Sequence, residues 1–189
     1  MGTDISYFAE RRTERGWEHC LVDFYCGEER NYALFAILAG VARLTNSGFE
    51  PIVPPRGFPA DSPAVGHLAG VPETPSCHNA TWLTLKELLD FPWHQKQWPC
   101  TGYVDAEEFL HFRIDGRPRH MSAQSGTVVS NAEMERRINA GHDTAGLLTL
   151  VSFGIPYAEF AGPFVTETLP LLSQQGPPED VRLILSFDS

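Results

Sequence analysis

Two stretches near the N-terminus have the pattern of neighbouring β-strands. Residues 3–12 alternate weakly between apolar and polar positions, and residues 17–27 are rich in aromatic and β-favouring residues. A short polar stretch that contains Gly16 separates them. Two such runs around a glycine-containing turn are typical of an antiparallel hairpin. The pattern therefore predicts an N-terminal β-hairpin.

A continuous apolar run follows at residues 33–42, which contain no polar side chain. Asn31 is in position to cap a helix at this point, and Gly48 lies just beyond its last turn. A helix that is apolar on all sides is buried on all sides. We therefore expect a central helix packed across the sheet. Gly40 lies in its interior, where glycine costs about 1 kcal/mol relative to alanine and indicates close approach of another backbone.

Residues 51–79 hold seven prolines and have no regular period. Proline cannot continue a long helix or an inner strand, so these residues are predicted to form a loop. A loop of this length inside a compact domain is usually a lid or a binding loop.

Three short helices are predicted after the loop. Each begins with a Ser, Thr or Asp cap that is followed three residues later by Glu. The pairs are Thr84 with Glu87, Asp105 with Glu108, and Ser130 with Glu133.

The last part of the chain predicts a strand, a helical stretch and a final strand. Residues 147–153 and 180–188 have the strand pattern, and residues 157–174 have a helical period that Pro163 and Pro170 must kink or divide. This strand–helix–strand unit has an order that allows parallel pairing through a right-handed crossover.

The order of these elements predicts an α+β fold, because the hairpin and the helices are segregated and do not alternate regularly. The expected architecture is an N-terminal β-hairpin joined to a small mixed sheet. A buried central helix and several short helices pack against this sheet. A chain of this length supports one sizeable core. We therefore interpret residues 1–189 as a single α+β domain with residues 51–79 as a Pro-rich loop excursion.

Charge and hydropathy restrict the partners. The net charge is −10, from 24 acidic and 14 basic side chains, and no basic run exceeds two residues. Nonspecific nucleic-acid binding needs a basic face, so we do not expect it.

A helix over residues 33–42 spans about 15 Å, roughly half of a bilayer core, so no membrane span is expected. The opening M-G-x-x-x-S fits the myristoylation pattern, but strand residues begin at once and no polybasic partner follows.

Four cysteines are present, at positions 20, 26, 77 and 100, without a C-x-x-C pair. Together with the absence of an apolar signal segment, they predict reduced thiols in a cytoplasmic protein. A zinc site built from Cys77, His78 and a distant cysteine is the alternative. Adjacent ligands without a paired partner have poor spacing for zinc, so no metal ligand set is predicted here.

Several stretches together resemble a known family: MGTDISYFAE, HNATWLTLKEL, NAEMERRI and the ending PPEDVRLILSFDS. The whole chain is similar to small uncharacterised phage and bacterial proteins that begin M-G-x-D-I-H and end V-R-L-x-x-x-F-D. The resemblance implies a prokaryotic or phage source, and it implies no activity or cofactor. Ser6 stands where the family has histidine, which weakens any metal role for Asp4 and position 6.

Candidate catalytic residues come from the predicted hairpin and the end of the Pro-rich loop. Asp4 on the first strand and Asp23 on the second give a carboxylate pair if the hairpin brings them together, and such pairs serve acid–base chemistry or hold a divalent metal. His78 is a candidate acid or base near neutral pH. The structural alternatives are a solvent-exposed sheet face for the two carboxylates and a capping role for His78.

Candidate ligand-binding residues are Arg56, Trp82 and Asp188. Arg56 has the geometry to clamp a carboxylate or phosphate, or alternatively to fix the loop by binding main-chain carbonyls. Trp82 offers a rigid aromatic surface next to the Pro-rich loop. We also expect Asp188 to join Asp4, Arg56 and His78 if these groups converge on one cavity.

Two functions remain open. The first is a cytoplasmic, phage-associated accessory protein that binds a protein or a small ligand without chemistry, with a homodimer as one possible assembly. The second is a hydrolase that uses an acidic and histidine site with a divalent metal. The sequence contains no H-E-x-x-H, G-x-S-x-G, Walker-type or G-x-G-x-x-G motif, which removes the most readily recognised enzyme classes but does not exclude an enzyme. The acidic composition and the Pro-rich loop with Trp82, Trp93 and Trp98 nearby favour binding.

Overall fold

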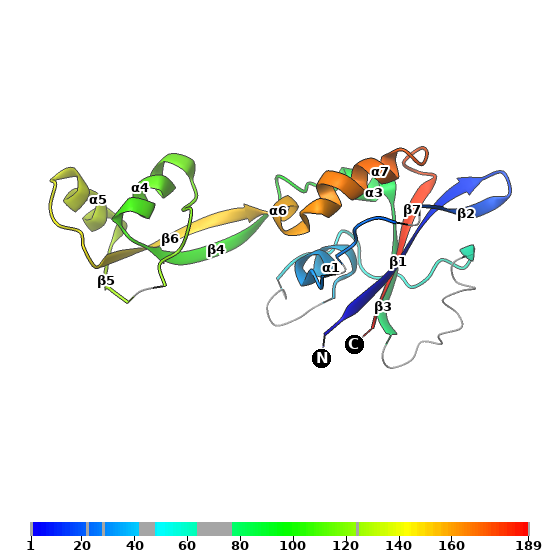
Figure 1. The fold of residues 1–189 in the computed structure, drawn as a ribbon, viewed down its shortest axis with the longest axis horizontal. Coiled ribbons are helices and arrows are strands. Elements are labelled where there is room, and N and C mark those ends of the chain that lie inside the picture. The colour runs from blue at the N-terminus through cyan, green and yellow to red at the C-terminus, as the bar shows by residue number, and fades with distance from the viewer. Residues whose placement is uncertain are drawn as a thin grey trace. The chain divides into compact units, whose positions relative to one another are not determined.

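The structure is a computed structural model of the 189-residue chain and confirms an α+β fold. It describes residues 2–21, 23–27, 29–41, 48–63, 77–123 and 125–188, with the main chain alone at positions 77 and 78. Two compact units are present (Figure 1). Unit 1 comprises Met1–Lys96 and Tyr157–Ser189, and unit 2 comprises Gln97–Pro156. Both belong to the stretch interpreted above as one domain, and that interpretation stays a prediction.

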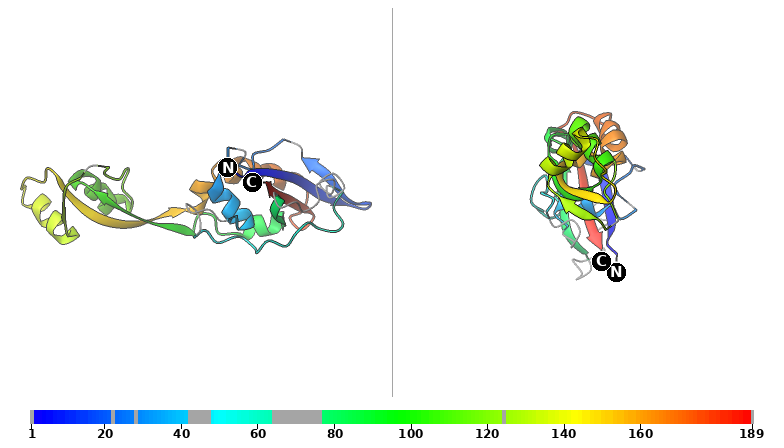
Figure 2. Two further views of the ribbon diagram at one scale, coloured as in Figure 1. Left: turned by 90° about the horizontal axis from the view of Figure 1, so that it is seen from below. Right: turned by 90° about the vertical axis from the view of Figure 1, so that its left-hand side faces the viewer.

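Unit 1 is built on a four-stranded antiparallel sheet with the order β2-β1-β7-β3. The strands are β1 (Asp4–Thr13), β2 (Gly16–Leu21), β3 (Cys77–Thr84) and β7 (Val181–Asp188). The predicted N-terminal hairpin is confirmed as β1 and β2. In both orientations of Figure 2 the N- and C-terminal ends of the chain lie close together, because β1 and β7 pair along their length.

Strand β7 forms the centre of unit 1, and seven of its eight residues are buried. Its alternate apolar side chains face the helix α1 (Tyr32–Ala39), where the rings of Phe35 and Phe187 lie 5.1 Å apart. All residues of α1 from Leu34 onward are buried. The predicted buried central helix is therefore confirmed, and it covers one face of the sheet.

The C-terminal end of α1 differs from the prediction. Asn31 caps the helix as expected, since its side-chain oxygen accepts a hydrogen bond from the Leu34 N–H. Gly40, however, is not an interior residue. It adopts the left-handed conformation with φ 65° and its N–H bonds back to the Ala36 carbonyl, so it ends the helix as a C-cap. Ala42, the last residue of the predicted apolar run, lies outside the described part.

The described part of the Pro-rich stretch, residues 51–63, follows the edge of the sheet and then crosses to the face opposite α1. The Gly57 N–H bonds to the Ala80 carbonyl of β3 at 2.9 Å. Residues 64–76 of the predicted loop lie outside the described residues. The loop prediction extended too far, because β3 already begins at Cys77.

One buried ion pair fixes this stretch to the sheet. Glu10 of β1 and Arg182 of β7 are register partners, and their side chains are 0% and 3% exposed. Arg182 Nε donates to Glu10 Oε2 at 2.9 Å, and the Ser62 hydroxyl donates to Glu10 Oε1 at 2.5 Å. A buried charge without its partners is strongly destabilising. The Pro-rich stretch therefore completes the polar centre of unit 1.

Further short helices complete unit 1. Helix α3 (Leu85–Asp90) begins with the predicted capping box of Thr84 and Glu87. The predicted helical stretch after residue 156 is divided into α6 (Tyr157–Ala161), a π-helical segment η1 (Phe164–Thr168) and α7 (Leu169–Ser173). The division falls at Gly162 and Pro163, as the prolines predicted.

Unit 2 is a three-stranded sheet with the order β4-β6-β5 and two helices on one of its faces. Its elements are β4 (Gln97–Val104), α4 (Ala106–Asp115), β5 (Thr127–Val129), α5 (Asn131–Asn139) and β6 (Leu147–Pro156). Strand β6 is antiparallel to β4 and parallel to β5. The parallel pairing that the order of the last two strands allows is not formed, because β6 and β7 belong to different sheets.

The core of unit 2 is small. Val104 and Val151 of the sheet pack against Phe109 of α4 and Met134 of α5. Both helices begin at the predicted caps, Asp105 and Ser130. Strand β4 was not predicted from the sequence. No helix among the described residues is both long enough and apolar enough to cross a membrane.

We expect Glu10→Gln to lower the free energy of unfolding by about 3–5 kcal/mol, because it leaves the buried guanidinium of Arg182 without its counter-charge. Urea unfolding followed by circular dichroism measures this. The matched control is Glu18→Gln, since Glu18 pairs with Arg11 at 2.9 Å on the exposed part of the same hairpin. That control should cost about 1 kcal/mol at most. Equal effects of the two substitutions would contradict a special role for the buried pair.

Candidate functional site

Two tryptophans and two arginines stack on the face of the unit 1 sheet opposite α1. The guanidinium of Arg182 lies 3.8 Å from the ring centre of Trp17 and 5.8 Å from that of Trp82. On Trp82, the guanidinium of Arg56 stacks at 3.8 Å. Cation–π contacts of this kind hold planar groups in fixed orientations. The sequence predicted Arg56 and Trp82 as ligand-binding residues, and the structure brings these two together.

Each of the three guanidinium nitrogens of Arg56 has an internal partner. Its Nε donates to the Trp82 carbonyl at 2.8 Å, and its two terminal nitrogens donate to the Glu87 carboxylate at 3.1 and 2.6 Å. Burial by itself would raise the pKa of Glu87, but the hydrogen bonds from Arg56 and Thr84 outweigh it and lower the pKa. This geometry agrees with the second role considered for Arg56, in which it fixes the Pro-rich loop by binding main-chain carbonyls.

The predicted acidic residues lie elsewhere. Asp4 and Asp188 are register partners in β1 and β7, and Asp4 accepts a hydrogen bond from Arg30 Nε at 3.0 Å. Strand β2 ends at Leu21 opposite Ala9, so the hairpin ladder does not place Asp23 opposite Asp4. The main chain of His78 belongs to β3, and its side chain lies outside the described part.

The predicted residues therefore form separate groups. Trp82 pairs with Ile184 in the sheet, and Asp188 lies four residues further along β7. At about 3.3 Å per residue the two positions are about 13 Å apart along the strand. Arg56 and Trp82 thus form one group, and Asp4 and Asp188 form another at the end of the sheet.

A pocket of about 470 Å³ lies beside the stacked arginines and tryptophans. Trp17, Trp82, Pro59 and Ala60 supply its apolar surface, and Arg182 is among its charged groups. Its volume falls in the range of small-molecule sites. Sequence reasoning selected Trp82 here but missed Trp17 and Arg182. The sequence feature that could have indicated Arg182 is the presence of an arginine in the largely apolar run VRLILSF.

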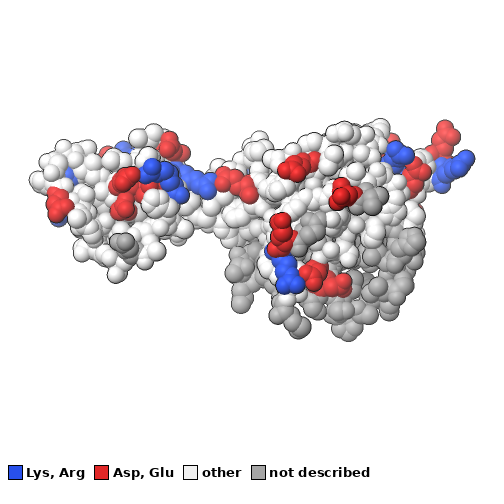
Figure 3. All heavy atoms as spheres, in the orientation of Figure 1, with Lys and Arg blue, Asp and Glu red and all other residues white. Residues whose placement is uncertain are grey.

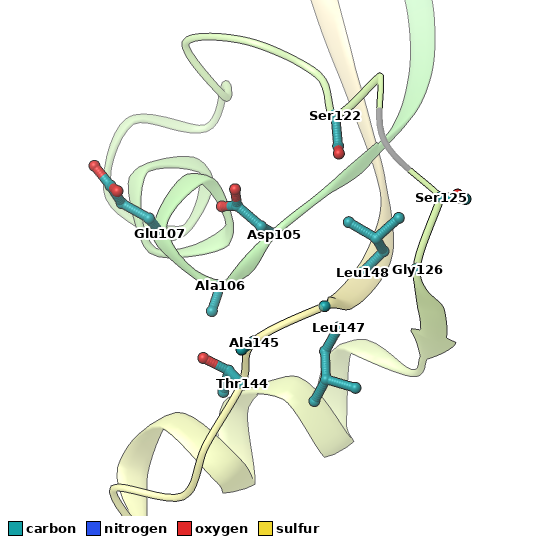
Figure 4. A pocket seen from close by; sticks show the side chains of 11 residues that line it. Asp105, Ala106, Glu107, Ser122, Ser125, Gly126, Thr144, Ala145, Leu147 and Leu148 are labelled. Atoms are coloured by element: carbon teal, nitrogen blue, oxygen red, sulfur yellow. The ribbon is translucent and has the colours of Figure 1, made fainter.

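Unit 2 has a smaller pocket of about 290 Å³, just under the usual range for small ligands. Figure 4 shows that its walls come from the start of α4, from Ser122, Ser125 and Gly126, and from the turn that leads into β6. The Asp105 carboxylate in its wall is already used as the α4 cap, since it accepts a hydrogen bond from the Glu108 N–H. The unit 1 pocket is therefore the better candidate for a ligand.

An acidic and histidine group on α4 can in principle hold a metal ion. One ligand atom each of Glu107, Glu108 and His111 lies within 4.8 Å of the others. Arg119 already pairs with both carboxylates, at 2.7 Å in each case. A cation would have to displace this guanidinium. On the face shown in Figure 3, basic side chains likewise lie beside acidic ones.

Glu108 is the most strongly held carboxylate of the group. It is almost fully buried and accepts hydrogen bonds from the Arg119 N–H at 2.7 Å, from Arg119 Nε at 2.9 Å and from the His120 N–H at 3.3 Å. Burial alone would raise the pKa of Glu108, but these hydrogen bonds and the charge of Arg119 outweigh it and lower the pKa to about 2. The carboxylate serves to tie the loop after α4 to the helix.

No family model matches the sequence, and neither a curated protein nor a solved structure matches the chain. Function is therefore inferred from the side chains of the protein itself.

Unit 2 should lose stability in acid through Glu108. The folded-state pKa is lowered, so the contribution is present above the ordinary value of 4.5 and is lost as the pH falls through about 2. Thermal unfolding measured between pH 6 and pH 2 should show this loss. Most of it should occur between the ordinary pKa of 4.5 and the lowered pKa of about 2. The Glu108→Gln variant should melt lower at pH 6 and should depend less on pH. Glu107→Gln is the control, since that side chain is exposed. Parallel pH profiles for the wild type and Glu108→Gln would contradict the assignment.

Divalent metal ions test the α4 group directly. We expect Mn²⁺ to leave the melting temperature of the wild type unchanged, because Arg119 already pairs with both carboxylates. The Arg119→Gln variant removes that competitor and should gain stabilisation by Mn²⁺. Arg113→Gln, which breaks an ion pair with Glu135, is the matched control. A clear Mn²⁺ stabilisation of the wild type would show that the ion displaces Arg119.

Proposed function

We propose that the protein is a binding protein that recognises another protein through the open face of the unit 2 sheet. This agrees with the first of the two functions that the sequence left open, a cytoplasmic, phage-associated accessory protein that binds a partner. The single observation that carries the proposal is a concentration of exposed apolar side chains in unit 2.

Eight large hydrophobic residues are exposed among the described residues, and six of them belong to unit 2. The six are Tyr103, Leu110, Ile114, Met121, Val128 and Leu150. Scattered single apolar residues on a surface are ordinary, but a contiguous patch usually marks an interaction site.

Three of the six share one sheet face. Tyr103 of β4 is the register partner of Leu150 of β6, so their side chains project from the same side. Val128 of β5 is the partner of Leu148, which lies two residues from Leu150 and therefore faces the same way. Val104 and Val151 face the opposite side, under the helices. Tyr103, Val128 and Leu150 are 44%, 55% and 46% exposed.

Among the described strand residues, the same face carries no charged side chain. Its other positions are Gln97, Pro99 and Thr101 of β4 and Leu148, Ser152, Gly154 and Pro156 of β6. The solvent-exposed face of an antiparallel sheet normally carries polar and charged side chains. Depletion of charge together with an exposed tyrosine is instead typical of the centre of a protein interface. These features support docking of a partner on the sheet face.

The sheet edges are less suited to a partner that adds a strand. The Tyr103 carbonyl, on the outer edge of β4, already accepts a hydrogen bond from the Ser122 N–H at 2.8 Å. Pro99 is four residues away and therefore occupies the same edge without an N–H to donate. On the other edge, β5 has three residues. We therefore expect the partner to contact side chains on the face, and not to extend the ladder.

The alternative function is a hydrolase with a divalent metal. The observation in its favour is the grouping of Glu107, Glu108 and His111 on α4. Against it, Arg119 holds both carboxylates. The Mn²⁺ experiment described above separates this alternative from binding.

Site-specific photocrosslinking tests the proposed face. A photoreactive residue at position 150 should give one defined protein adduct in cells that make the protein. Tyr103→Ser together with Val128→Thr should reduce the adduct roughly tenfold, because residues at the centre of an interface contribute most of the binding free energy.

Two controls make the result specific. A photoreactive residue at position 171 places the probe on an exposed apolar position of unit 1, and it should not give the same adduct. Circular dichroism should show that the double variant remains folded. An adduct of equal yield at both positions, or one that the double variant leaves unchanged, would contradict the proposal.

A further inference from the structure

We propose that the unit 1 pocket binds a small organic carboxylate with an apolar body, and that the ligand carboxylate takes the place now filled by the side chain of Asp61. This site is separate from the unit 2 face and does not depend on the function proposed for it.

Two donors from different strands converge on one carboxylate. Arg182 of β7 donates through Nη1 to Asp61 Oδ1 at 2.9 Å, and Trp17 of β2 donates through its indole N–H to Asp61 Oδ2 at 3.0 Å. Each oxygen of the carboxylate thus receives its own hydrogen bond. Fixed donors that match both oxygens are the geometry with which proteins recognise carboxylates.

The donors are rigid, whereas the carboxylate that they hold lies near solvent. Arg182 is almost fully buried, and its guanidinium is fixed by Glu10 and by the ring of Trp17. The Asp61 side chain is 65% exposed and comes from the Pro-rich stretch, not from the sheet. Exchange of this carboxylate for another one therefore leaves the sheet unchanged.

Arg182 has a further donor that its present partners do not satisfy. Its Nη2 is buried and makes no hydrogen bond among the described residues, although it lies 2.9 Å from Glu10 Oε2 as an ionic contact. A buried donor without an acceptor is costly, and such groups in native proteins call for an explanation. Nη2 lies against Glu10, so Nη1, which donates to Asp61, is the terminal nitrogen that a ligand oxygen would reach from the pocket side.

The pocket next to Asp61 has room for the rest of such a ligand. Its volume is about 470 Å³, and Trp17, Trp82, Pro59 and Ala60 line it together with Asp61 itself. Indole and proline rings favour a flat apolar group. The ligand class is therefore an aromatic or aliphatic acid, not inorganic phosphate.

The charges around the pocket explain why Asp61 competes with the ligand. Arg12 and Arg182 are the basic residues of the lining, and Asp61 and Glu179 are the acidic ones. Glu10 adds a further negative charge behind Arg182. An added anion is tolerated only if it replaces an existing carboxylate. Removal of Asp61 should therefore create the strongest binding.

Chemical rescue of Asp61→Ala with benzoate tests this inference. The variant should melt at a lower temperature than the wild type, because Arg182 and Trp17 lose their shared acceptor. Benzoate should raise its melting temperature in a saturable manner and should bind it at least about tenfold more tightly than the wild type. Benzamide, which has the same ring without the charge, should have little effect.

The indole N–H resonance of Trp17 reports the site directly in the full-length protein. In a ¹H–¹⁵N spectrum, Trp17→Phe identifies this resonance by its loss, and Trp98→Phe of unit 2 serves as the control. Benzoate should shift the Trp17 signal in Asp61→Ala and leave the Trp98 signal unchanged. If the alanine variant is too unstable, Asp61→Asn with the same titration replaces it, with a smaller gain because the amide oxygen still accepts.

Absence of a saturable Trp17 shift in both Asp61 variants would overturn the proposal. So would equal responses to benzoate and benzamide, since they would show binding by the apolar ring alone. The photocrosslinking result for unit 2 has no influence on either outcome.

Discussion

The buried contact between Glu10 and Arg182 is the interaction on which unit 1 depends. It places a charge pair at the centre of a sheet whose other buried positions are mostly apolar. Such a pair needs further hydrogen bonds around it, because charges that are removed from water are costly to leave unpaired. Ser62 and Asp61 of the Pro-rich stretch supply those contacts, and Trp17 covers the guanidinium. The position of the stretch and the aromatic pocket beside it follow from this one constraint.

Elements encoded by neighbouring residues were predictable from the sequence, and those that depend on distant partners were not. The capping signals work within one turn, so boxes such as that of Thr84 were correct. Gly40 was misplaced because an apolar run does not show where a helix ends. Strand β4 was not predicted because Pro99 and Gly102 interrupt its strand pattern. Its partner strand β6 lies about fifty residues away in the sequence. The contacts of Arg182 join three segments that meet only in the folded chain.

The open face of unit 2 has a simple structural cause. A three-stranded sheet has two faces, and the two helices of this unit lie on the same one. On the other face, Tyr103 and Leu150 are 44% and 46% exposed. A small unit of this kind gains little stability from its own core, and a partner on the open face would add apolar burial. Binding and stability of the unit would then be linked.

Unit 2 is an insertion in the chain of unit 1, and its two ends meet. The N–H of Tyr157 donates to the carbonyl of Lys96 at 2.9 Å, so the residues on either side of the insertion are already hydrogen-bonded to each other. A short turn at this point would close unit 1 without the intervening sixty residues. The two sheets share no strand, so the strand pairing of the unit 1 sheet does not require any strand of the inserted part.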